Sequence, residues 1–391
     1  MSNKVPQIRF KGYSDAWVQR EFVKMVDRVS EASTAELPRV EFEDLISGMG
    51  RLNKDVTKPG DTRSGIHFVA GDVLYGKLRP YLNNWLHATF EGLALGDFWV
   101  FRTKEMLESS FLYALIQAPK YQQAANLSSG TKMPRSDWKT VSTTEFLVPE
   151  KQEQQKIGEL FNNLDNLIAA NQRKLDLLKE QKKGYLQKMF PKNGAKVPEL
   201  RFAGFADDWE ERKLGDEFKK VSERNDGSFG RNHWISVAKM YFQSPEKVQS
   251  NNIDTRTYVM REGDIAFEGH PNSEFKFGRF VANDIGAGVV SELFPIYRHQ
   301  HEYDNNYWKN AIQIERTMAP IFAKSITSSG NSSNKLDTKH FLRQKILIPQ
   351  INEQKKIGSF FKQLDDTIAL HQRKLDLLKE QKKGFLQKMF V

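Results

Sequence analysis

The side chains best suited to hydrogen-bond with a ligand lie in short polar segments rich in Arg, Lys, Asn and Ser. Arg and Lys pair with guanine edges, Asn and Gln with adenine, and Ser, Thr and backbone N–H groups with phosphates. Glycine in such segments lets a nucleic-acid backbone approach closely. We therefore predict DNA contacts from these segments. In the first half the candidates are Lys77, Arg79, Tyr81, Asn83, Asn84, Ser129, Thr131, Lys132 and Arg135. In the second half they are Arg231, Asn232, His233, Asn272, Ser273, Lys276, Ser329, Asn331, Ser332 and Lys335.

Motifs for catalysis are missing from the sequence. It contains no Gly-x-x-x-x-Gly-Lys-Ser/Thr loop for nucleoside triphosphates and no Gly-x-Gly-x-x-Gly dinucleotide fingerprint. Asp264 followed by Glu274-Phe275-Lys276 imitates the acid–acid–lysine pattern of metal-dependent nucleases, but the equivalent Asp72 has no such follower. His299 and His301 could share one strand face, yet no third metal ligand is in sight. We expect no catalytic residue and no metal site.

Composition narrows the class of protein further. The chain has 391 residues, a net charge of +10 and no cysteine, so disulfides and thiolate metal sites are excluded and a cytoplasmic location fits. No apolar run approaches the roughly 18 residues of a membrane span. A basic chain allows nucleic acid as a partner without proving it. Two alternatives stay open beside DNA reading, namely a nuclease or methyltransferase fragment and a pure coiled-coil scaffold.

One segment of the chain occurs twice, 200 residues apart. Residues 152–190 and 352–390 align without a gap, and the stretch 172–184 is identical to 372–384. A weaker repeat opens each half, where Val5-Pro6-Gln7-Ile8-Arg9-Phe10 matches Val197-Pro198-Glu199-Leu200-Arg201-Phe202. Between these markers the halves diverge. The sequence therefore predicts an α+β protein with domains at 1–149 and 191–349, and helices at 150–190 and 350–391.

The two repeated segments read as long helices. Proline stands just before each, at Pro149 and Pro349, and apolar residues then recur at steps of three and four. This spacing predicts a heptad seam with polar interruptions, and each helix, about 57 Å long, needs a partner to bury it. We predict that the copies form an antiparallel coiled coil. The seam residues are Phe161, Leu164, Ile168, Asn171, Leu175, Leu178 and Tyr185, with Phe361, Leu364, Ile368, His371, Leu375, Leu378 and Phe385.

Four glycines, Gly158, Gly184, Gly358 and Gly384, recur inside the helices and suggest close helix approach. The domains read as mixed α and β. We expect strands at residues 66–69, 141–148, 289–297 and 345–348 and a helix at 111–123. No strand order is predicted.

Positive charge is concentrated on the helical segments. Residues 151–190 hold eight basic and five acidic residues, and residues 350–391 hold nine and five. The domains are nearly neutral, so any DNA-binding domain must gather its cations on one face.

The whole pattern resembles the specificity (S) subunit of type I restriction–modification systems. The resemblance rests on the repeated Pro-x-x-x-Glu-Gln-x-x-Ile entry into each helix, followed by Leu164-Asp165 and Leu364-Asp365. Gly71-Asp72-Val73-Leu74-Tyr75, Arg79-Pro80-Tyr81 and a Ser-Ser-Gly segment upstream of each helix add to it.

This resemblance implies how the protein works. Each domain would be a target-recognition domain that reads one half of a split double-stranded DNA target, and the helix pair would set the spacing. Two modification (methyltransferase) subunits would dock on the chain, and restriction subunits could join them. S-adenosylmethionine, ATP and Mg would be bound by those partners, and this chain would bind no cofactor.

Overall fold

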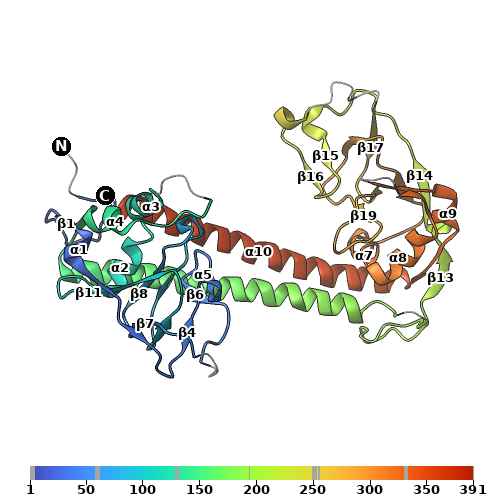
Figure 1. Ribbon diagram of the computed structural model, residues 1–391. Helices are drawn as coiled ribbons and strands as arrows, with labels where there is room; N and C mark the ends of the chain where they lie inside the picture. Colours follow the sequence, from blue (N-terminus) through green and yellow to red (C-terminus); the bar gives the residue numbers. More distant parts are fainter. Residues whose placement is uncertain are drawn as a thin grey trace. The chain divides into compact units, whose positions relative to one another are not determined.

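The computed structural model describes residues 5–57, 62–127, 132–192, 194–248, 253, 256–329 and 333–390. The chain forms two compact units (Figure 1). One unit comprises Met1–Leu175 and His371–Val391, and the other comprises Asp176–Leu370. Each unit therefore contains one globular domain together with one half of each long helix.

Two four-stranded sheets form the first domain. One is ordered β2 (Val26–Val29), β11 (Phe98–Thr103), β8 (Val73–Gly76) and β9 (Trp85–His87). The other is ordered β3 (Ala32–Ser33), β7 (Gly65–Phe68), β10 (Gly92–Ala94) and β4 (Arg39–Val40). The pairs are β1 (Val18–Glu21) with β12 (Glu145–Val148), and β5 (Leu45–Ile46) with β6 (Arg51–Leu52). The helices are α1 (Phe22–Met25), η1 (Phe42–Asp44), η2 (Pro80–Leu82), α2 (Ser109–Leu115), α3 (Pro119–Asn126) and α4 (Trp138–Thr143).

The second domain repeats the main sheet of the first, whereas its other strands form pairs. Its main sheet is ordered β14 (Phe218–Val221), β21 (Ile296–His299), β18 (Ile265–Glu268) and β19 (Arg279–Ala282). The pairs are β13 (Glu210–Lys213) with β24 (Lys345–Ile348), β17 (Thr257–Met260) with β20 (Gly288–Ser291), β15 (Ile235–Ser236) with β16 (Tyr241–Phe242), and β22 (Ile326–Ser329) with β23 (Asn334–Leu336). The helices are α6 (Leu214–Glu217), η3 (Arg231–His233), η4 (Pro245–Lys247), α7 (Asn305–Ala311), α8 (Glu315–Ala323) and α9 (Thr338–Arg343).

The main sheets of the two domains are equivalent strand by strand. Each sheet begins on the strand that follows the first short helix, β2 or β14. The next strand is the one that precedes the longer helices of the domain, β11 or β21. The sheet then ends on an antiparallel pair, β8 with β9 or β18 with β19. The short pairs β1–β12 and β13–β24 also correspond, since each places the strand before a long helix beside the first strand of its domain. The mixed α/β fold with an internal repeat is therefore confirmed, although the domains share little sequence.

Three of the expected segments differ in detail from the structure. Residues 111–123 form two helices because Pro119, which lacks an N–H, starts α3. Residues 141–143 belong to α4, which Asp137 caps by accepting a hydrogen bond from the Thr140 N–H at 2.7 Å. Residues 289–297 divide into β20 and β21. The strands expected at 66–69 and 345–348 correspond to β7 and β24.

The repeated opening segment of each half ties two helix ends together. In the first unit the Ile8 N–H bonds to the Lys388 carbonyl at the end of α10 (Ile351–Met389), and Arg9 bonds bidentately to Glu153 at the start of α5 (Lys151–Lys188). In the second unit the Leu200 N–H bonds to the Lys188 carbonyl, and Arg201 bonds bidentately to Glu353. The Glu of each Pro-x-x-x-Glu-Gln entry is thus a buried ion-pair partner.

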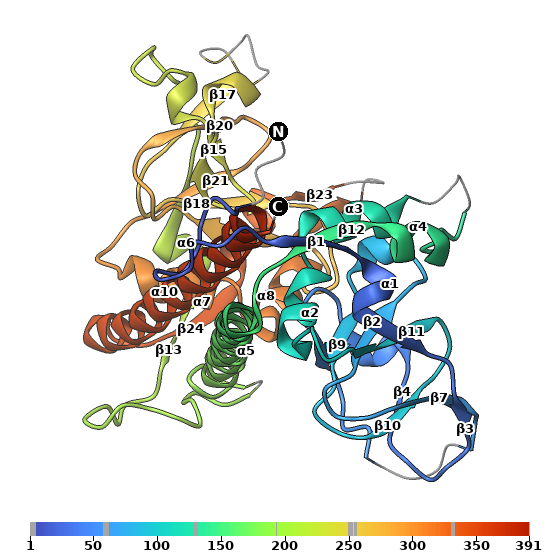
Figure 2. The same ribbon diagram turned by 90° about the vertical axis from the view of Figure 1, so that its left-hand side faces the viewer.

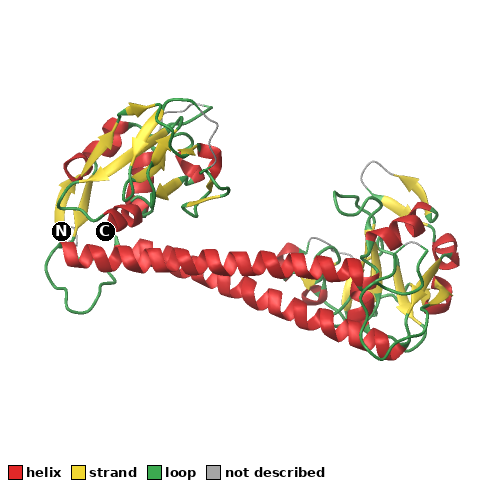
Figure 3. Cartoon of the chain, turned by 90° about the horizontal axis from the view of Figure 1, so that it is seen from below, coloured by secondary structure: helices red, strands yellow, loops and turns green. Residues whose placement is uncertain are grey.

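Within each unit the halves of α5 and α10 pack against each other and run in opposite directions (Figure 3). Phe161 lies near Phe390 and Asp165 bonds to Lys382 in the first unit. Tyr185 lies near Phe360 and Lys182 bonds to Asp365 in the second. One polar interruption of each heptad pattern, Lys182 or Lys382, is therefore the lysine of an interhelical ion pair, which holds the register.

The predicted seam residues are not equally covered. Those that are buried are Phe161, Leu164, Ile168, Asn171, Leu175, Leu178, Phe361 and Leu375. Those that remain partly exposed are Tyr185, Leu364, Ile368, His371, Leu378 and Phe385. The Asn171 side chain donates to the Leu167 carbonyl of its own helix at 2.8 Å.

The interpretation of the four helical glycines was wrong in part. Gly158 contacts Ser110 of α2, which lies between α5 and β9 (Figure 2), and Gly358 contacts Asp304 and Tyr307 at the start of α7. Both glycines allow a helix of the globular domain to approach, rather than the other long helix. Gly184 and Gly384 have nothing within 4 Å of the position that a Cβ would take.

This difference predicts opposite effects of alanine at two glycines of α5. A Cβ at Gly158 would lie 2.5 Å from the Ser110 Cβ and 2.8 Å from its carbonyl carbon, so Gly158→Ala should lower the free energy of unfolding by about 1–3 kcal/mol. Gly184→Ala is the matched control and should raise stability by up to about 1 kcal/mol. Urea unfolding of both variants measures this. Equal stability of the two variants would contradict the close contact at Gly158.

Among the residues that the structure describes, no helix is both long and apolar enough to cross a membrane.

Candidate nucleic-acid interface

The first candidate loop follows the buried strand β8. Arg79 and Asn83, on either side of η2, have left-handed φ values of 47° and 56°, which non-glycine residues adopt only when their surroundings hold them. The Asn83 N–H bonds to the Pro80 carbonyl, and the Asn83 carbonyl accepts from the Gly48 N–H. This fixed turn leaves the Tyr81 ring 56% exposed at its tip.

A second predicted segment joins this loop. The Arg79 N–H bonds to the Pro134 carbonyl at 2.7 Å, and the Ser136 N–H bonds to the Lys77 carbonyl at 2.8 Å. Leu78 and Arg135 form an isolated β-bridge between these bonds. Candidates that lie more than fifty positions apart in the sequence are therefore brought onto one surface.

One carboxylate organises the cations of this surface. Asp97 accepts two bonds from the Arg135 guanidinium, at 3.1 and 3.3 Å, and lies 3.8 Å from the Lys77 ammonium. The Arg135 side chain is 55% exposed, so part of it is accessible to a ligand. Asp97 thus restrains two cations that would otherwise repel each other.

The remaining candidates of the first half are placed differently. Asn84 is only 6% exposed and its side-chain N–H reaches the Phe42 carbonyl at 3.4 Å, so it packs within the domain. Lys132 is exposed. Ser129 and Thr131 lie outside the described residues.

In the second domain the loop after β18 occupies the equivalent place. The Asn272 side chain accepts from the N–H groups of Glu274 and Phe275, which closes a tight turn. The Lys276 ammonium lies over the Phe277 ring, 5.2 Å from the ring centroid, and the Lys276 backbone N–H donates to the Glu315 carboxylate at 3.1 Å. Asn272, Ser273 and Lys276 are all exposed.

The β22–β23 hairpin closes against this loop. The Asn334 N–H bonds to the Gly269 carbonyl at 2.8 Å, and the Asn334 side chain donates to the Phe277 carbonyl. Lys335 is exposed on β23, and the backbone of Ser329 lies on β22. Asn331 and Ser332 lie outside the described residues. Loop and hairpin form one surface, as in the first domain.

Arg231, Asn232 and His233 are exposed on η3, before β15. This segment packs beside β20, where the His233 carbonyl lies close to Gly288 and Trp234 bridges to Val289. The structure thus ties these three candidates to a different strand pair from the loop after β18.

Two equivalent aspartates support the strands that carry the loops. Asp72 accepts two bonds from Arg102 and one from the Val69 N–H, and Asp264 accepts two from Arg298 and one from the Arg261 N–H. Both carboxylates are almost completely buried. Asp264, the aspartate of the nuclease-like pattern, is therefore paired with Arg298, and it holds the turn that precedes β18.

His299 and His301, the two histidines that could have shared a metal ion, have different surroundings. His299 stacks on Tyr303 with ring centroids 3.8 Å apart, and burial lowers its pKa to about 3. His301 is exposed. Among the described residues no three His, Asp or Glu side chains are grouped as metal ligands.

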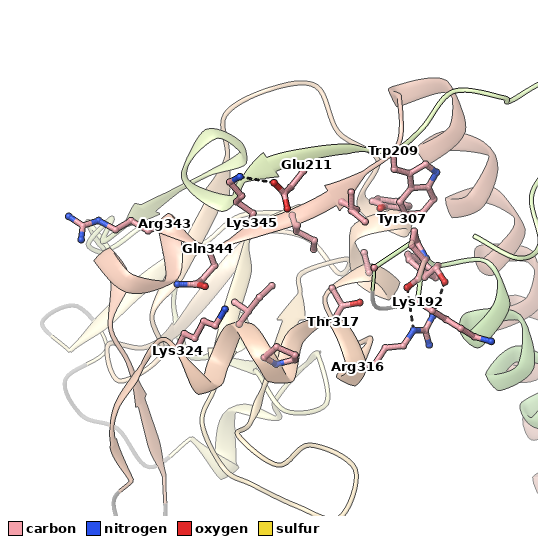
Figure 4. Close-up of a pocket in the computed structure, with 18 residues that line it drawn as sticks. Lys192, Trp209, Glu211, Tyr307, Arg316, Thr317, Lys324, Arg343, Gln344 and Lys345 are labelled. Atoms are coloured by element: carbon pink, nitrogen blue, oxygen red, sulfur yellow. Dashed lines mark hydrogen bonds and ion pairs between the residues drawn. The ribbon is translucent and has the colours of Figure 1, made fainter. Parts of the chain in front are cut away.

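A cavity of about 480 Å³ in the second unit lies where the globular domain meets the end of α5 (Figure 4). The Arg316 guanidinium donates there to the carbonyls of Leu186, Gln187 and Phe190, and so caps the helix end. Lys345, on the opposite wall, bonds to Glu211. None of the residues predicted to touch DNA lines this cavity.

Sequence reasoning missed the acidic residues that arrange the surface. Asp97 and Glu268 lie next to glycines, but nothing in their spacing marks them as partners of distant cations. His270, which bonds to Glu268 at 2.6 Å, was also missed. Only the fold shows which cation each carboxylate holds.

The model of the type I restriction modification DNA specificity domain matches residues 88–180 and 206–380. The chain belongs to this family. Each match includes part of one globular domain and most of one long helix, so the two matches follow the internal repeat. The resemblance to specificity subunits is thereby confirmed.

Relatives and solved structures agree with this membership. The chain is 21% identical over 342 residues to the MjaVIII specificity subunit of Methanocaldococcus jannaschii, covering 81% of this chain and 75% of that protein. It is 28% identical over 103 residues to the EcoDI specificity subunit of Escherichia coli, covering 26% and 23%. An S subunit structure from M. genitalium superposes with a TM-score of 0.63 at 15% identity, over 99% of each chain. A structure described as concerning complex assembly and conformational transition of the type I R-M system gives 0.53 at 16%, over 95% and 96%. At these identities the structures show a shared fold.

Proposed function

We propose that this chain is the DNA-reading specificity subunit of a type I restriction–modification complex, with each globular domain reading one half of a split target. The observation that carries the proposal is the contrast within the repeat. The two main sheets have the same strand order, whereas the loops after β8 and β18 differ in length and sequence. A constant frame with variable polar loops suits two readers of different sequences.

The electrostatics of the loops support readout rather than chemistry. Lys77 and Arg135 are restrained by Asp97, and the Lys276 ammonium lies over the Phe277 ring at 5.2 Å. Cations that are held in place by acids lose less side-chain freedom when they bind base edges, which favours selective contacts. The nearly neutral charge of the domains then limits unspecific attraction to phosphates.

The partners follow from this role. We infer that two modification subunits dock on the helix pair and the domains, and that restriction subunits join them. S-adenosylmethionine, ATP and Mg would be bound by those subunits, and this chain would bind no cofactor and catalyse no step. A target in chromosomal DNA places the complex in the cytoplasm.

The test is to express the chain with its modification partner and map adenine methylation across a genome. We expect methylation within a split motif that is absent without this chain. Incubation of the chain alone with DNA, Mg and S-adenosylmethionine should neither cleave nor methylate it. Activity of the chain alone would instead favour the enzyme alternative.

Shortening both helices should shorten the spacer between the half-sites. Removing seven residues from 172–184 and the matching seven from 372–384 keeps the heptad register and shortens each helix by about 10 Å. At 3.4 Å per base pair, the preferred spacer should lose about three base pairs. Methylation mapping measures the spacer, and an unaltered spacer would refute a ruler role for the helices.

A further inference from the structure

Both domains hold a nitrogen-bearing side chain of the candidate loop on a carboxylate. In the first domain Lys77 follows β8 and shares Asp97 with Arg135. In the second domain His270 follows β18, its Nδ1 lies 2.6 Å from Glu268, and the same carboxylate lies 3.8 Å from Arg279. Different residues thus build the same arrangement, in which one acid holds a loop side chain and an arginine.

In the pair of Glu268 and His270, the carboxylate is buried and the imidazole is exposed to solvent. Glu268 is a buried end residue of β18, with its side chain 8% exposed, whereas the His270 side chain is 61% exposed. Because Nδ1 is bonded to the carboxylate, Nε2 is the ring nitrogen left to meet a ligand. The His270 N–H also bonds to Glu268, so backbone and ring are fixed by one partner.

The backbone under His270 is stiff. A Cβ at Gly269 would lie 2.2 Å from the Asn334 carbonyl oxygen, so only glycine allows the loop and the β22–β23 hairpin to approach this closely. The Gly269 carbonyl in turn accepts from the Asn334 N–H. His270 is therefore presented from the seam between two segments that carry predicted DNA-contacting residues.

On the basis of the proposed function, we propose that His270 reads the second half-site, as the counterpart of Lys77, and that Glu268 positions it. A protonated imidazole donates from Nε2 to guanine N7 or O6, the acceptors that Lys and Arg also use. Glu268 is a positioning residue, because it acts on DNA only through the ring that it orients. His270 is then a specificity-determining residue of the second domain.

The experiment uses the chain assembled with its modification subunits. Selection from a randomised duplex pool first defines the split motif, and fluorescence anisotropy then measures affinity for that duplex. His270→Ala should relax one base position in the second half and weaken binding by about tenfold. His270→Lys should restore both the affinity and the base preference, because lysine donates to the same guanine acceptors. Glu268→Gln should relax the same base position, because the ring loses the carboxylate that orients it.

A matched control separates this contact from general effects of histidine. His340 lies on α9 with its side chain 54% exposed and 3.9 Å from Asp337, and His340→Ala should alter neither the motif nor the affinity. If the wild type selects a split motif but His270→Ala keeps both motif and affinity, the inference is wrong and the proposed function stands. If the wild type selects no split motif, the proposed function itself fails.

Discussion

Exchanging residues 191–349 for the same domain of another specificity subunit is expected to replace one half of the recognised DNA sequence and leave the other half unchanged. Loop and supporting segment are bonded to each other inside one unit in both halves, through Arg79 with Pro134 and Gly269 with Asn334. Each reading surface is thus assembled from its own domain. Adenine methylation mapping of the hybrid complex reads out both halves at once.

The donor domain must keep two contacts that the original domain makes with the long helices. Arg201 lies inside the exchanged segment but bonds bidentately to Glu353 of α10, and the Leu200 N–H bonds to the Lys188 carbonyl of α5. A donor with the Val-Pro-x-x-Arg-Phe opening keeps both bonds. Exchange of residues 1–149 is the matched control and should change the opposite half. A change in both halves after either exchange would contradict independent reading.

The elements that could be predicted from sequence are those whose signal is local. The long helices follow from apolar spacing, from Pro149 and Pro349, and from the repetition itself. The antiparallel pairing follows because each stripe needs a partner, and Lys182 with Asp365 confirms it in one unit. The nuclease-like pattern at Asp264 could be set aside because Asp72, the equivalent aspartate of the first half, is not followed by a second acid and a lysine.

What could not be predicted depends on contacts between distant segments. The common strand order of the domains rests on pairings such as β8 with β11, for which neither strand carries a register signal. Gly158 and Gly184 look alike in sequence, and only the position of α2 leaves no room for a Cβ at Gly158. The clamping of Lys77 by Asp97 likewise exists only after β8 and β11 have paired.

Replacing Lys382 by methionine is expected to destabilise the first unit by about 3–5 kcal/mol, because it leaves a buried carboxylate without its counter-charge. The Lys382 ammonium lies 2.5 Å from Asp165 and 2.6 Å from the Gln117 side-chain oxygen Oε1, and the two charged side chains are about 10% exposed. Methionine keeps the length and apolar stem of lysine, so the loss is mainly electrostatic. Urea unfolding of the variant against the wild type measures it.

The chain offers an exact internal control for this substitution. Lys182 stands in the same identical stretch and makes the same bond, to Asp365, but there the side chains are 24% and 30% exposed. Water therefore screens that pair, and Lys182→Met should lower stability by about 1 kcal/mol or less. Equal losses for the two variants would show that burial of the first pair has no energetic consequence.

The dependence on pH tests the cause of the loss. Burial already raises the pKa of the Asp165 carboxyl, against the opposing effect of Lys382, and removal of that lysine should raise it further. A carboxyl whose pKa is higher in the folded than in the unfolded state weakens the fold at neutral pH, and this penalty disappears as protonation proceeds. The difference between Lys382→Met and wild type should thus shrink from about pH 7.5 toward pH 4. Asp165→Leu added to Lys382→Met should recover most of the stability at neutral pH, since no buried charge remains. Because the two lysines lie in identical sequence, any difference in stability between their variants arises from Gln117 and the rest of the first domain, which packs over the helix pair. If the loss of stability in Lys382→Met neither depended on pH nor was recovered by Asp165→Leu, the cause would be packing and not the buried charge.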